Sequence, residues 1–238
     1  MPRSLTLSDA QIAFYESEGY IVLEDVVEPD LLARLRQETD DMVSKSAEVT
    51  ENTEIYDLED THSAAQPRVR RLKIPHTVMP AVDALVRSPQ IAAIVAQLFG
   101  TGVRLQTTKL NIKAAGYGAA VEWHQDWTFY PHTNDDLLAM GVMLDDCGPD
   151  NAPLMMLPGT HGGPVFDHHA GGYFCGAMDP QACALDYEKA VALTAPAGSI
   201  TLHHVRMVHG SQLNRSNRPR RLLLAQYTAV DAWPLVNM

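Results

Sequence analysis

The stretch Trp123-His124-Gln125-Asp126 sets a histidine and a carboxylate two positions apart. Alternate side chains of a β-strand share one face, so on a strand both groups would reach a single divalent metal ion. A third ligand has to come from elsewhere, and His209, within Met207–Ser211 (MVHGS), offers one. His124, Asp126 and His209 match the 2-His-1-carboxylate facial triad, which leaves three positions on iron(II) open for chemistry. The pattern favours an oxygenase over a structural metal site, which would close its coordination sphere with four protein ligands.

Other histidines compete for the distal ligand position. His203 and His204 lie in or beside an expected strand at 199–203, and either could replace His209 if its side chain pointed inward. The segment 160–190 holds further histidines, which we expect to be solvated loop residues in preference to substrate contacts. These are His161, His168 and His169.

Composition narrows the class of protein. The chain has 238 residues, of which 46% are hydrophobic, which is enough for one large domain with a substantial core. A formal net charge of −11 argues against nucleic acid or an anionic membrane as the main partner, since both need a positive surface. The three cysteines have no C-x-x-C spacing, and the first residues lack a signal-peptide core. We also expect no apolar run of membrane-spanning length, and therefore a cytoplasmic protein with reduced thiols.

The order of elements predicts a mainly β fold with a helical N-terminal layer. Helices are expected from about residue 8 to Gly19, from about 28, and over 79–99 with a break at Ser88-Pro89. A short strand follows Gly19, and residues 47–67 are expected to form an irregular loop. Helices first and short strands afterwards indicate a β barrel or sandwich. The later strands are expected at 103–113, 121–127, 137–144, 153–157, 191–193, 199–203 and 220–228.

These residues together resemble a known family. Asn111-Ile112-Lys113, Trp123–Asp126, Leu157–His161 (LPGTH) and His209-Gly210-Ser211 with Arg220 occur in the order seen in the phytanoyl-CoA dioxygenase (PhyH) family of Fe(II)/2-oxoglutarate oxygenases, which includes ectoine hydroxylases. The resemblance runs from about residue 7 to 228. It implies a double-stranded β-helix (jelly-roll, cupin-like) with iron held by His124, Asp126 and His209. We therefore expect one domain over 1–238, divided into a helical support layer (1–102) and a jelly-roll core (103–230) with a lid near 160–190.

The resemblance also suggests how 2-oxoglutarate is held. Its far carboxylate needs a cation, and an arginine fork matches a carboxylate with two hydrogen bonds. Arg218, Arg220 and Arg221 all follow His209, and the family spacing favours Arg220. Strand alternation puts Arg220 and Arg221 on opposite faces. Ser211 and Asn111 match positions that hydrogen-bond 2-oxoglutarate in the similar enzymes. One departure is that Gly141 stands four residues before Asp145, where many relatives carry tryptophan.

The substrate is predicted to be a small anion, such as a carboxylate or a phosphorus acid. The basic run Pro67–Lys73 is unusual in so acidic a chain, and Arg71 and Lys73 are the candidates to reach the pocket. The same run would also suit a charged edge strand that blocks aggregation. Trp127 and Phe129 are candidate cavity-lining residues, although aromatic side chains here would equally suit the core.

The expected reaction is oxidation of a substrate C–H bond with dioxygen, with 2-oxoglutarate converted to succinate and CO2. Asp126 favours hydroxylation or a related oxidation, because the related halogenases carry a small residue at that position. Two alternatives stay open at this point. One is a hydrolase or isomerase that uses a redox-inactive metal such as zinc on a cupin-like barrel, which would not explain Arg220. The other is a non-catalytic binding or sensing jelly-roll. The sequence gives neither the substrate's identity nor the oligomeric state.

Overall fold

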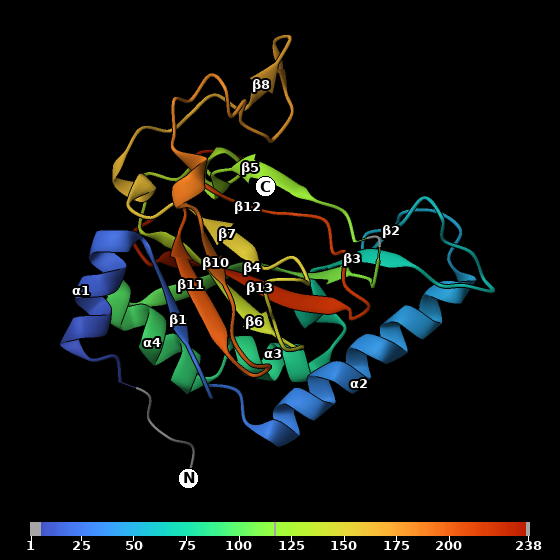
Figure 1. The fold of residues 1–238 in the computed structure, drawn as a ribbon. Helices are drawn as coiled ribbons and strands as arrows, with labels where there is room; N and C mark the ends of the chain where they lie inside the picture. Colours follow the sequence, from blue (N-terminus) through green and yellow to red (C-terminus); the bar gives the residue numbers. More distant parts are fainter. Residues whose placement is uncertain (1–5, 117, 237–238) are drawn as a thin grey trace.

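Two facing antiparallel sheets form the centre of the computed structural model, which describes residues 6–116 and 118–236 (Figure 1). The larger sheet has seven strands in the order β1-β11-β6-β13-β4-β3-β2, and the smaller has four in the order β10-β7-β12-β5. The larger sheet consists of β1 (Tyr20–Leu23), β2 (Tyr56–Leu58), β3 (Val69–Lys73), β4 (Val103–Lys113), β6 (Leu137–Met143), β11 (Ile200–His204) and β13 (Arg220–Ala229). The smaller consists of β5 (Val121–His124), β7 (Leu154–Met156), β10 (Val191–Leu193) and β12 (His209–Ser211). This is the predicted jelly-roll architecture.

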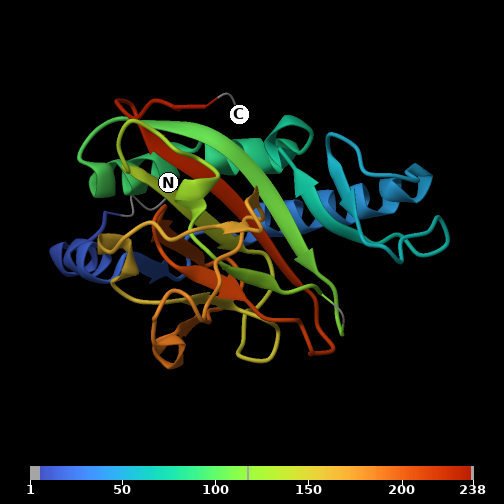
Figure 2. The same cartoon turned by 90° about the horizontal axis from the view of Figure 1, so that it is seen from above.

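Helices cover the outer face of the larger sheet (Figures 1 and 2). The Ser8 side chain accepts from the Gln11 amide and begins the first helix, and Gly19 ends it in the left-handed region. The expected break at Ser88-Pro89 separates the third and fourth helices. The helices are α1 (Asp9–Glu18), α2 (Pro29–Lys45), α3 (Pro80–Val86) and α4 (Pro89–Phe99), with short 3₁₀ turns η1 (Ser46–Glu48), η2 (Pro75–Thr77), η3 (Asp126–Thr128), η4 (Thr160–Gly162) and η5 (Tyr187–Lys189).

Side-chain alternation along β13 decides which residues face the helices. Leu223 and Ala225 belong to the large core between the sheet and the helices. Leu222 and Leu224 instead belong to a second core between the two sheets. Arg220 lies two residues before Leu222 and therefore on the same face of the strand, so its side chain projects into the interior between the sheets. In Figure 2, β13 runs beside its partner β4 along the length of the molecule.

Several expectations about local structure were wrong. The segment 47–67 contains a strand, β2, and the first hundred residues contribute β2 and β3 to the larger sheet in addition to the strand β1 that was expected after Gly19. The basic run forms β3, which lies between β2 and β4 and is therefore not an edge strand. The strand expected at 121–127 ends at His124 and turns into η3.

The apolar run Pro80–Phe99 corrects another expectation. It is long and apolar enough to cross a membrane by length and composition alone. In the structure it is interrupted at Arg87-Ser88, and the resulting α3 and α4 place Val82, Ile91 and Ile94 in the core. Their hydrophobicity is explained by packing against the larger sheet.

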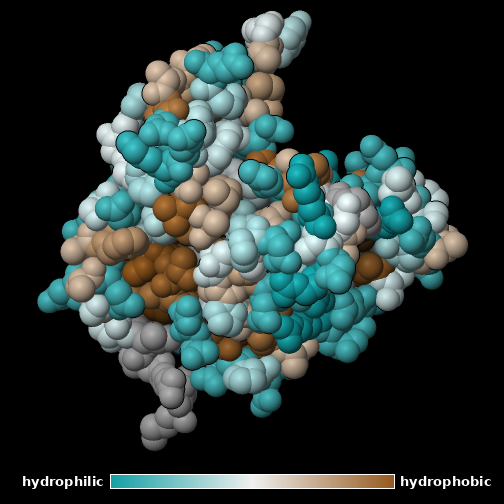
Figure 3. Space-filling view, viewed as in Figure 1, coloured by the Kyte–Doolittle hydropathy of each residue, from teal (hydrophilic) through white to brown (hydrophobic). Residues whose placement is uncertain are grey.

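An exposed apolar patch lies over α1 and β1 on the face drawn in Figure 3. Phe14 and Tyr20 meet there edge to face at 5.5 Å between ring centroids. They border an open groove of about 370 Å³ along the free edge of β1. The groove is separate from the residues predicted to bind metal, which lie between the sheets.

Candidate metal centre and cosubstrate pocket

His124, Asp126 and His209 come together in the interior between the two sheets. One potential ligand atom from each lies within 4.8 Å of the other two, and all three residues are buried. His124 ends β5 and pairs directly with His209 on β12, which places the two rings 4.1 Å apart. The η3 turn after β5 carries the Asp126 carboxylate toward both rings. The fold therefore assembles the predicted triad from two adjacent strands and one turn.

Hydrogen bonds leave the ring nitrogen Nε2 of each triad histidine free. The Nδ1–H of His124 donates to the Glu122 carbonyl at 2.8 Å, and that of His209 donates to the Met207 carbonyl at 2.9 Å. Such bonds to the other nitrogen orient a ligating imidazole and select its tautomer. Burial lowers the pKa of both rings and so favours the neutral form that a metal needs.

The Asp126 carboxylate is held in its charged form. Burial alone would raise its pKa, but His203, His209, Lys109 and His124 outweigh that effect and hold the pKa well below its usual range. Two neutral imidazoles and one carboxylate are the donor set of a facial iron(II) site. The residues present therefore fit the metal that the sequence predicted.

The competing histidines take other positions. His203 faces the site, but its ring does not belong to the three-ligand group. His204, on the opposite face of β11, accepts at Nδ1 from the Arg206 amide and packs near His161. The structure thus groups His209 with His124 and Asp126 as the three candidate ligands, while His203 lies beside the group, 3.5 Å from Asp126, and His204 faces away from it.

Gln125, which lies between His124 and Asp126, forms hydrogen bonds with the segment 160–190. Its side chain donates to the Pro164 and Arg206 carbonyls and accepts from the Phe166 amide, and its backbone amide donates to Nε2 of His168. His168 is 1% exposed, so the expectation of a solvated residue was wrong for it. Farther along, the segment forms an exposed hairpin, β8 (His169–Ala170) with β9 (Tyr173–Phe174). The hairpin stands above the sheets in Figure 1.

An inner pocket adjoins the triad and contains the residues predicted for 2-oxoglutarate. Arg220 is 2% exposed, and its Nε and Nη2 donate to the Ala152 carbonyl at 3.1 and 2.7 Å. Burial lowers its pKa to about 10, so it is charged at neutral pH. The Ser211 hydroxyl is buried and has no hydrogen-bond partner within the described residues. The pocket is lined by Lys109, Asn111, Lys113, Val121, His124, Asp126, Leu154, His203, His209, Ser211, Arg220 and Leu224.

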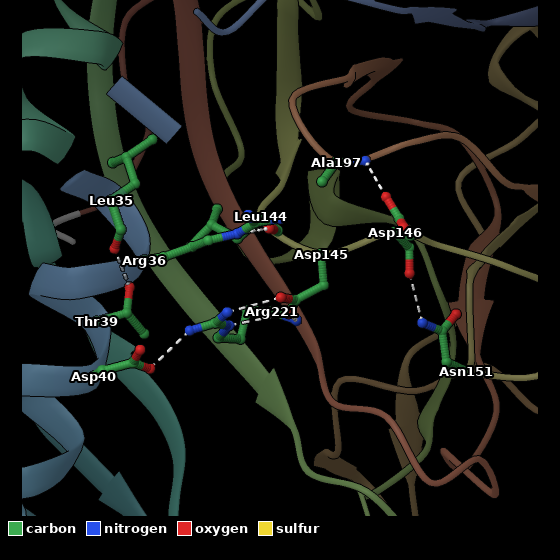
Figure 4. A network of polar contacts seen from close by, with 10 residues as sticks. All are labelled: Leu35, Arg36, Thr39, Asp40, Leu144, Asp145, Asp146, Asn151, Ala197 and Arg221. Carbon is green, nitrogen blue, oxygen red and sulfur yellow. Dashed lines mark hydrogen bonds and ion pairs between the residues drawn. The ribbon is translucent and has the colours of Figure 1, made fainter. Parts of the chain in front are cut away.

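The neighbouring arginines are used for other contacts. Arg221 donates to both carboxylate oxygens of Asp145 and to Asp40 on α2, which ties the sheet to that helix (Figure 4). Arg218 forms an exposed ion pair with Asp150. Of the three arginines, Arg220 alone lines the pocket beside the triad.

The departure at Gly141 also has a structural reason. A Cβ added there would lie 2.6 Å from Oγ1 of Thr201, so the interior has no room for a larger side chain at this position. Asp145, which follows four residues later, is held by Arg221. Neither residue therefore serves as a pocket contact of the kind that many relatives have.

Lys113 is a pocket residue that the sequence analysis missed. It is 4% exposed, and its ammonium group donates to the Gln212 carbonyl. Burial, together with the positive charge of Arg220, lowers its pKa to about 7. Lys109, Asn111 and Lys113 alternate along β4 and so share its inner face. Residues two positions before and two positions after Asn111 share its face of the strand, so the sequence pattern alone could have identified both lysines as pocket residues.

We expect the affinity for 2-oxoglutarate to fall as the pH rises above about 7. The dianion favours the charged form of Lys113, so binding takes up a proton when the free lysine is neutral. The dissociation constant should rise toward tenfold per pH unit, the limit for one linked proton. Anaerobic titration of the iron-loaded protein between pH 6.5 and 9 measures this dependence.

Lys113→Met should weaken binding at pH 6.5 and flatten the profile. Lys189→Met, which removes an exposed lysine paired with Asp186, should leave the profile unchanged. An unaltered pH dependence in Lys113→Met would assign the effect to another group.

An outer pocket of about 310 Å³ opens next to the triad and shares Asn111 with the inner pocket. Phe129 lines it and packs edge to face between His124 and Phe174, at 6.0 and 5.1 Å. Trp127 instead packs in a small core with Leu137 and Val205 and does not line this pocket. The lining residues are Arg71, Lys109, Asn111, Val121, Glu122, His124, Asp126, Phe129, Tyr130, Cys175, Gly176 and Ala177.

The two basic candidates of β3 differ in position. Arg71 lines the outer pocket, and its Nε is buried without a hydrogen-bond partner within the described residues. Lys73 does not line it and pairs with Asp57 on β2 at 3.1 Å. Arg71 lies farther from the same carboxylate, at 3.7 Å. The structure thus places Arg71, and not Lys73, beside the triad.

Comparisons with known proteins agree with this geometry. The family model described as phytanoyl-CoA dioxygenase (PhyH) matches residues 15–222. A probable alpha-ketoglutarate-dependent hypophosphite dioxygenase of Stutzerimonas stutzeri is 39% identical, over 93% of this chain and 79% of the relative. An L-proline trans-4-hydroxylase of Streptomyces griseoviridis is 30% identical, over 98% and 91%. The crystal structure of EctD from S. alaskensis with 2-oxoglutarate and 5-hydroxyectoine superposes with a TM-score of 0.78 at 26% identity, over 94% and 77% of the two chains.

Proposed function

The chain belongs to the PhyH family and is an Fe(II)- and 2-oxoglutarate-dependent dioxygenase, and we propose that it oxidises a small anionic substrate held beside His124, Asp126 and His209. The observation that carries this proposal is the cationic lining of the outer pocket. Family membership also sets aside the two alternatives, a hydrolase or isomerase and a non-catalytic jelly-roll.

The inner pocket is assigned to the cosubstrate. In this proposal Arg220 and Lys113 pair with the far carboxylate of 2-oxoglutarate, and Ser211 and Asn111 donate hydrogen bonds to it. The buried, unpartnered hydroxyl of Ser211 supports this role, because leaving it unsatisfied costs about 1–3 kcal/mol in the absence of a ligand. The far carboxylate would thus be bound by the charged Arg220 and, below a pH of about 7, by a charged Lys113 as well.

The proposed oxidation has the stoichiometry of 2-oxoglutarate-dependent dioxygenases, in which each atom of dioxygen enters a different product. The metal with 2-oxoglutarate and dioxygen supplies the oxidising power: one oxygen atom enters succinate as CO2 leaves, and the other enters the substrate between hydrogen and its C or P atom. The protein orients the substrate and excludes water, and the apolar ring of Phe129 at the mouth serves the second purpose. Asp126 supplies the carboxylate ligand, so oxygenation is favoured over halogenation.

Lys109 and Arg71 supply the positive charge for the substrate. The side-chain ammonium group of Lys109 has no ion pair or hydrogen bond within the described residues. It lies close enough to lower the pKa of both Asp126 and His124. An unpaired ammonium group beside a metal centre attracts anions locally, although the chain as a whole carries a net charge of −11.

The pocket volume and the relatives narrow the class of anion. A volume of about 310 Å³ is at the lower end of the range for small-molecule pockets. The relative that is 39% identical acts, by its name, on hypophosphite. We therefore place a phosphorus oxyanion first and a short carboxylate second among the candidate substrates, with a P–H or C–H bond as the one oxidised.

The test is substrate-dependent succinate release by the iron-loaded enzyme. We expect hypophosphite or another small oxyanion to stimulate release and to yield one oxidised product per succinate. Lys109→Met should lower this coupled turnover at least tenfold, because the pocket loses its unpaired charge, and should spare slow 2-oxoglutarate decarboxylation without substrate. Lys73→Met is the matched control and should retain coupled turnover, since Lys73 pairs with Asp57 outside the pocket. Coupled turnover with neutral or cationic compounds alone would contradict an anionic substrate.

A further inference from the structure

His203 is a buried histidine whose ring nitrogens have no hydrogen-bond partner within the described residues. It is 1% exposed and lines the inner pocket, with its ring centroid 4.6 Å from that of His209. Leaving a buried polar group unsatisfied costs about 1–3 kcal/mol. Because the unsatisfied imidazole of His203 lies next to the candidate metal centre, we expect it to have a role at that site.

The two oxygens of the Asp126 carboxylate face different groups. Oδ1 lies 3.7 Å from Nε2 of His124, which is one of the other two candidate ligands. Oδ2 lies 3.5 Å from Nε2 of His203. In the described part of the chain, His203 is the only side chain paired with Oδ2. One carboxylate oxygen therefore lies beside the candidate ligand His124, and the other lies beside His203.

We propose that His203 is a positioning residue that holds Oδ2 of Asp126 and so makes the carboxylate bind iron through Oδ1 alone. The inference rests on the proposed role of Asp126 as a metal ligand. With three protein donor atoms on a six-coordinate iron, three positions stay open. The keto acid end of 2-oxoglutarate would use two of these positions, and the third would be left for dioxygen. A carboxylate bound through both oxygens would occupy that last position.

The strand geometry makes this role specific to His203. On β11 it pairs with Ala139 of β6, whose small side chain leaves the imidazole free to reach the metal centre. Thr201 lies two residues earlier on the same face, and its hydroxyl is also buried and unpartnered. Among the described residues, Thr201 forms no hydrogen bond with the triad. Thr201→Val is therefore a matched control that removes a buried polar group from the same face of the strand.

The test compares His203→Phe, which keeps a ring without nitrogen, with His203→Gln, which keeps a donor near the position of Nε2. We expect His203→Phe to lower iron(II) affinity or coupled turnover by about 10–100-fold, the usual effect of losing the partner of a ligand. It should also change the visible charge-transfer band that appears when iron(II) and 2-oxoglutarate bind anaerobically. His203→Gln should restore most of both properties, and Thr201→Val should leave them as in the wild type.

The outcomes separate this inference from the proposed function. Loss of iron in Asp126→Ala, together with wild-type affinity, band and coupling in a folded His203→Phe, would overturn the role of His203 and leave the metal site standing. Retention of iron and turnover in Asp126→Ala would overturn the metal site itself. Should His203→Phe not fold, His203→Met provides the same loss of the donor with a more adaptable side chain, and the same readouts decide.

Discussion

Replacing His124, Asp126 or His209 by alanine is expected to abolish iron-dependent turnover in each case while the protein stays folded. Each residue supplies one of the three converging ligand atoms, so each loss leaves two donors for the metal. The hydrophobic clusters of the two cores contain none of the three, which is why the fold should survive. Iron content, 2-oxoglutarate consumption and thermal unfolding of the three variants measure the effect.

The choice of distal ligand is tested in the same series. His204→Ala should retain iron and activity, because this side chain lies on the opposite face of β11 and contacts the Arg206 backbone. Wild-type iron content and activity in His209→Ala, combined with loss of iron in His204→Ala, would mean that the distal ligand is misassigned.

The parts of the fold that were predictable follow from strong local signals. The capped helices could be placed because Ser8 and Ser88 begin α1 and α4, and Gly19 and Gly100 end them. The opposite faces of Arg220 and Arg221 could be assigned because a strand alternates with a period of two. That period needs only local sequence, and β13 is long enough to show it.

The parts that were missed depend on pairing between distant segments. Strands β2 and β12 have three residues each, and they are defined by their pairing with β3 and with β5 and β7 and not by a pattern of their own. Whether Lys73 is free for a ligand depends on Asp57, which β2 brings within 3.1 Å, and the loop expected at 47–67 gave no sign of that contact. The burial of His168 likewise depends on Gln125, 43 residues away in the chain.

The distribution of basic residues illustrates the same limit. In the sequence, Arg68 to Lys73 form the conspicuous basic run, whereas Lys109 and Lys113 stand alone. In the fold, β3 pairs with β4 so that Arg71 faces Asn111 and Lys73 faces Lys109. Of these residues, Arg71 and Lys109 line the outer pocket, one from each strand, and neither strand's sequence alone shows that they meet there. In the proposed function these two cations attract an anion locally, although the chain as a whole is negatively charged.

Arg220→Ala is expected to weaken 2-oxoglutarate binding by at least tens of fold while leaving iron affinity nearly unchanged. Removing one partner of a buried, hydrogen-bonded charge pair costs about 2–5 kcal/mol. Arg220 is 2% exposed and is oriented by the Ala152 carbonyl, and its loss would leave Lys113, whose pKa is lowered to about 7, to pair alone with the far carboxylate of 2-oxoglutarate. Anaerobic titration of the charge-transfer band with 2-oxoglutarate gives the affinity, and iron content is measured separately.

Arg221→Ala provides the matched control one residue away. It should lower the free energy of unfolding by about 1–3 kcal/mol, because Asp145 loses a half-buried partner and α2 loses its contact through Asp40. Its affinity for 2-oxoglutarate should nevertheless match the wild type, since Arg221 faces the helices and not the pocket. Arg218→Ala removes an exposed ion pair and should change neither property by more than about 0.5 kcal/mol. Equal losses of 2-oxoglutarate affinity in all three variants would mean that a diffuse basic surface, and not Arg220, binds the cosubstrate.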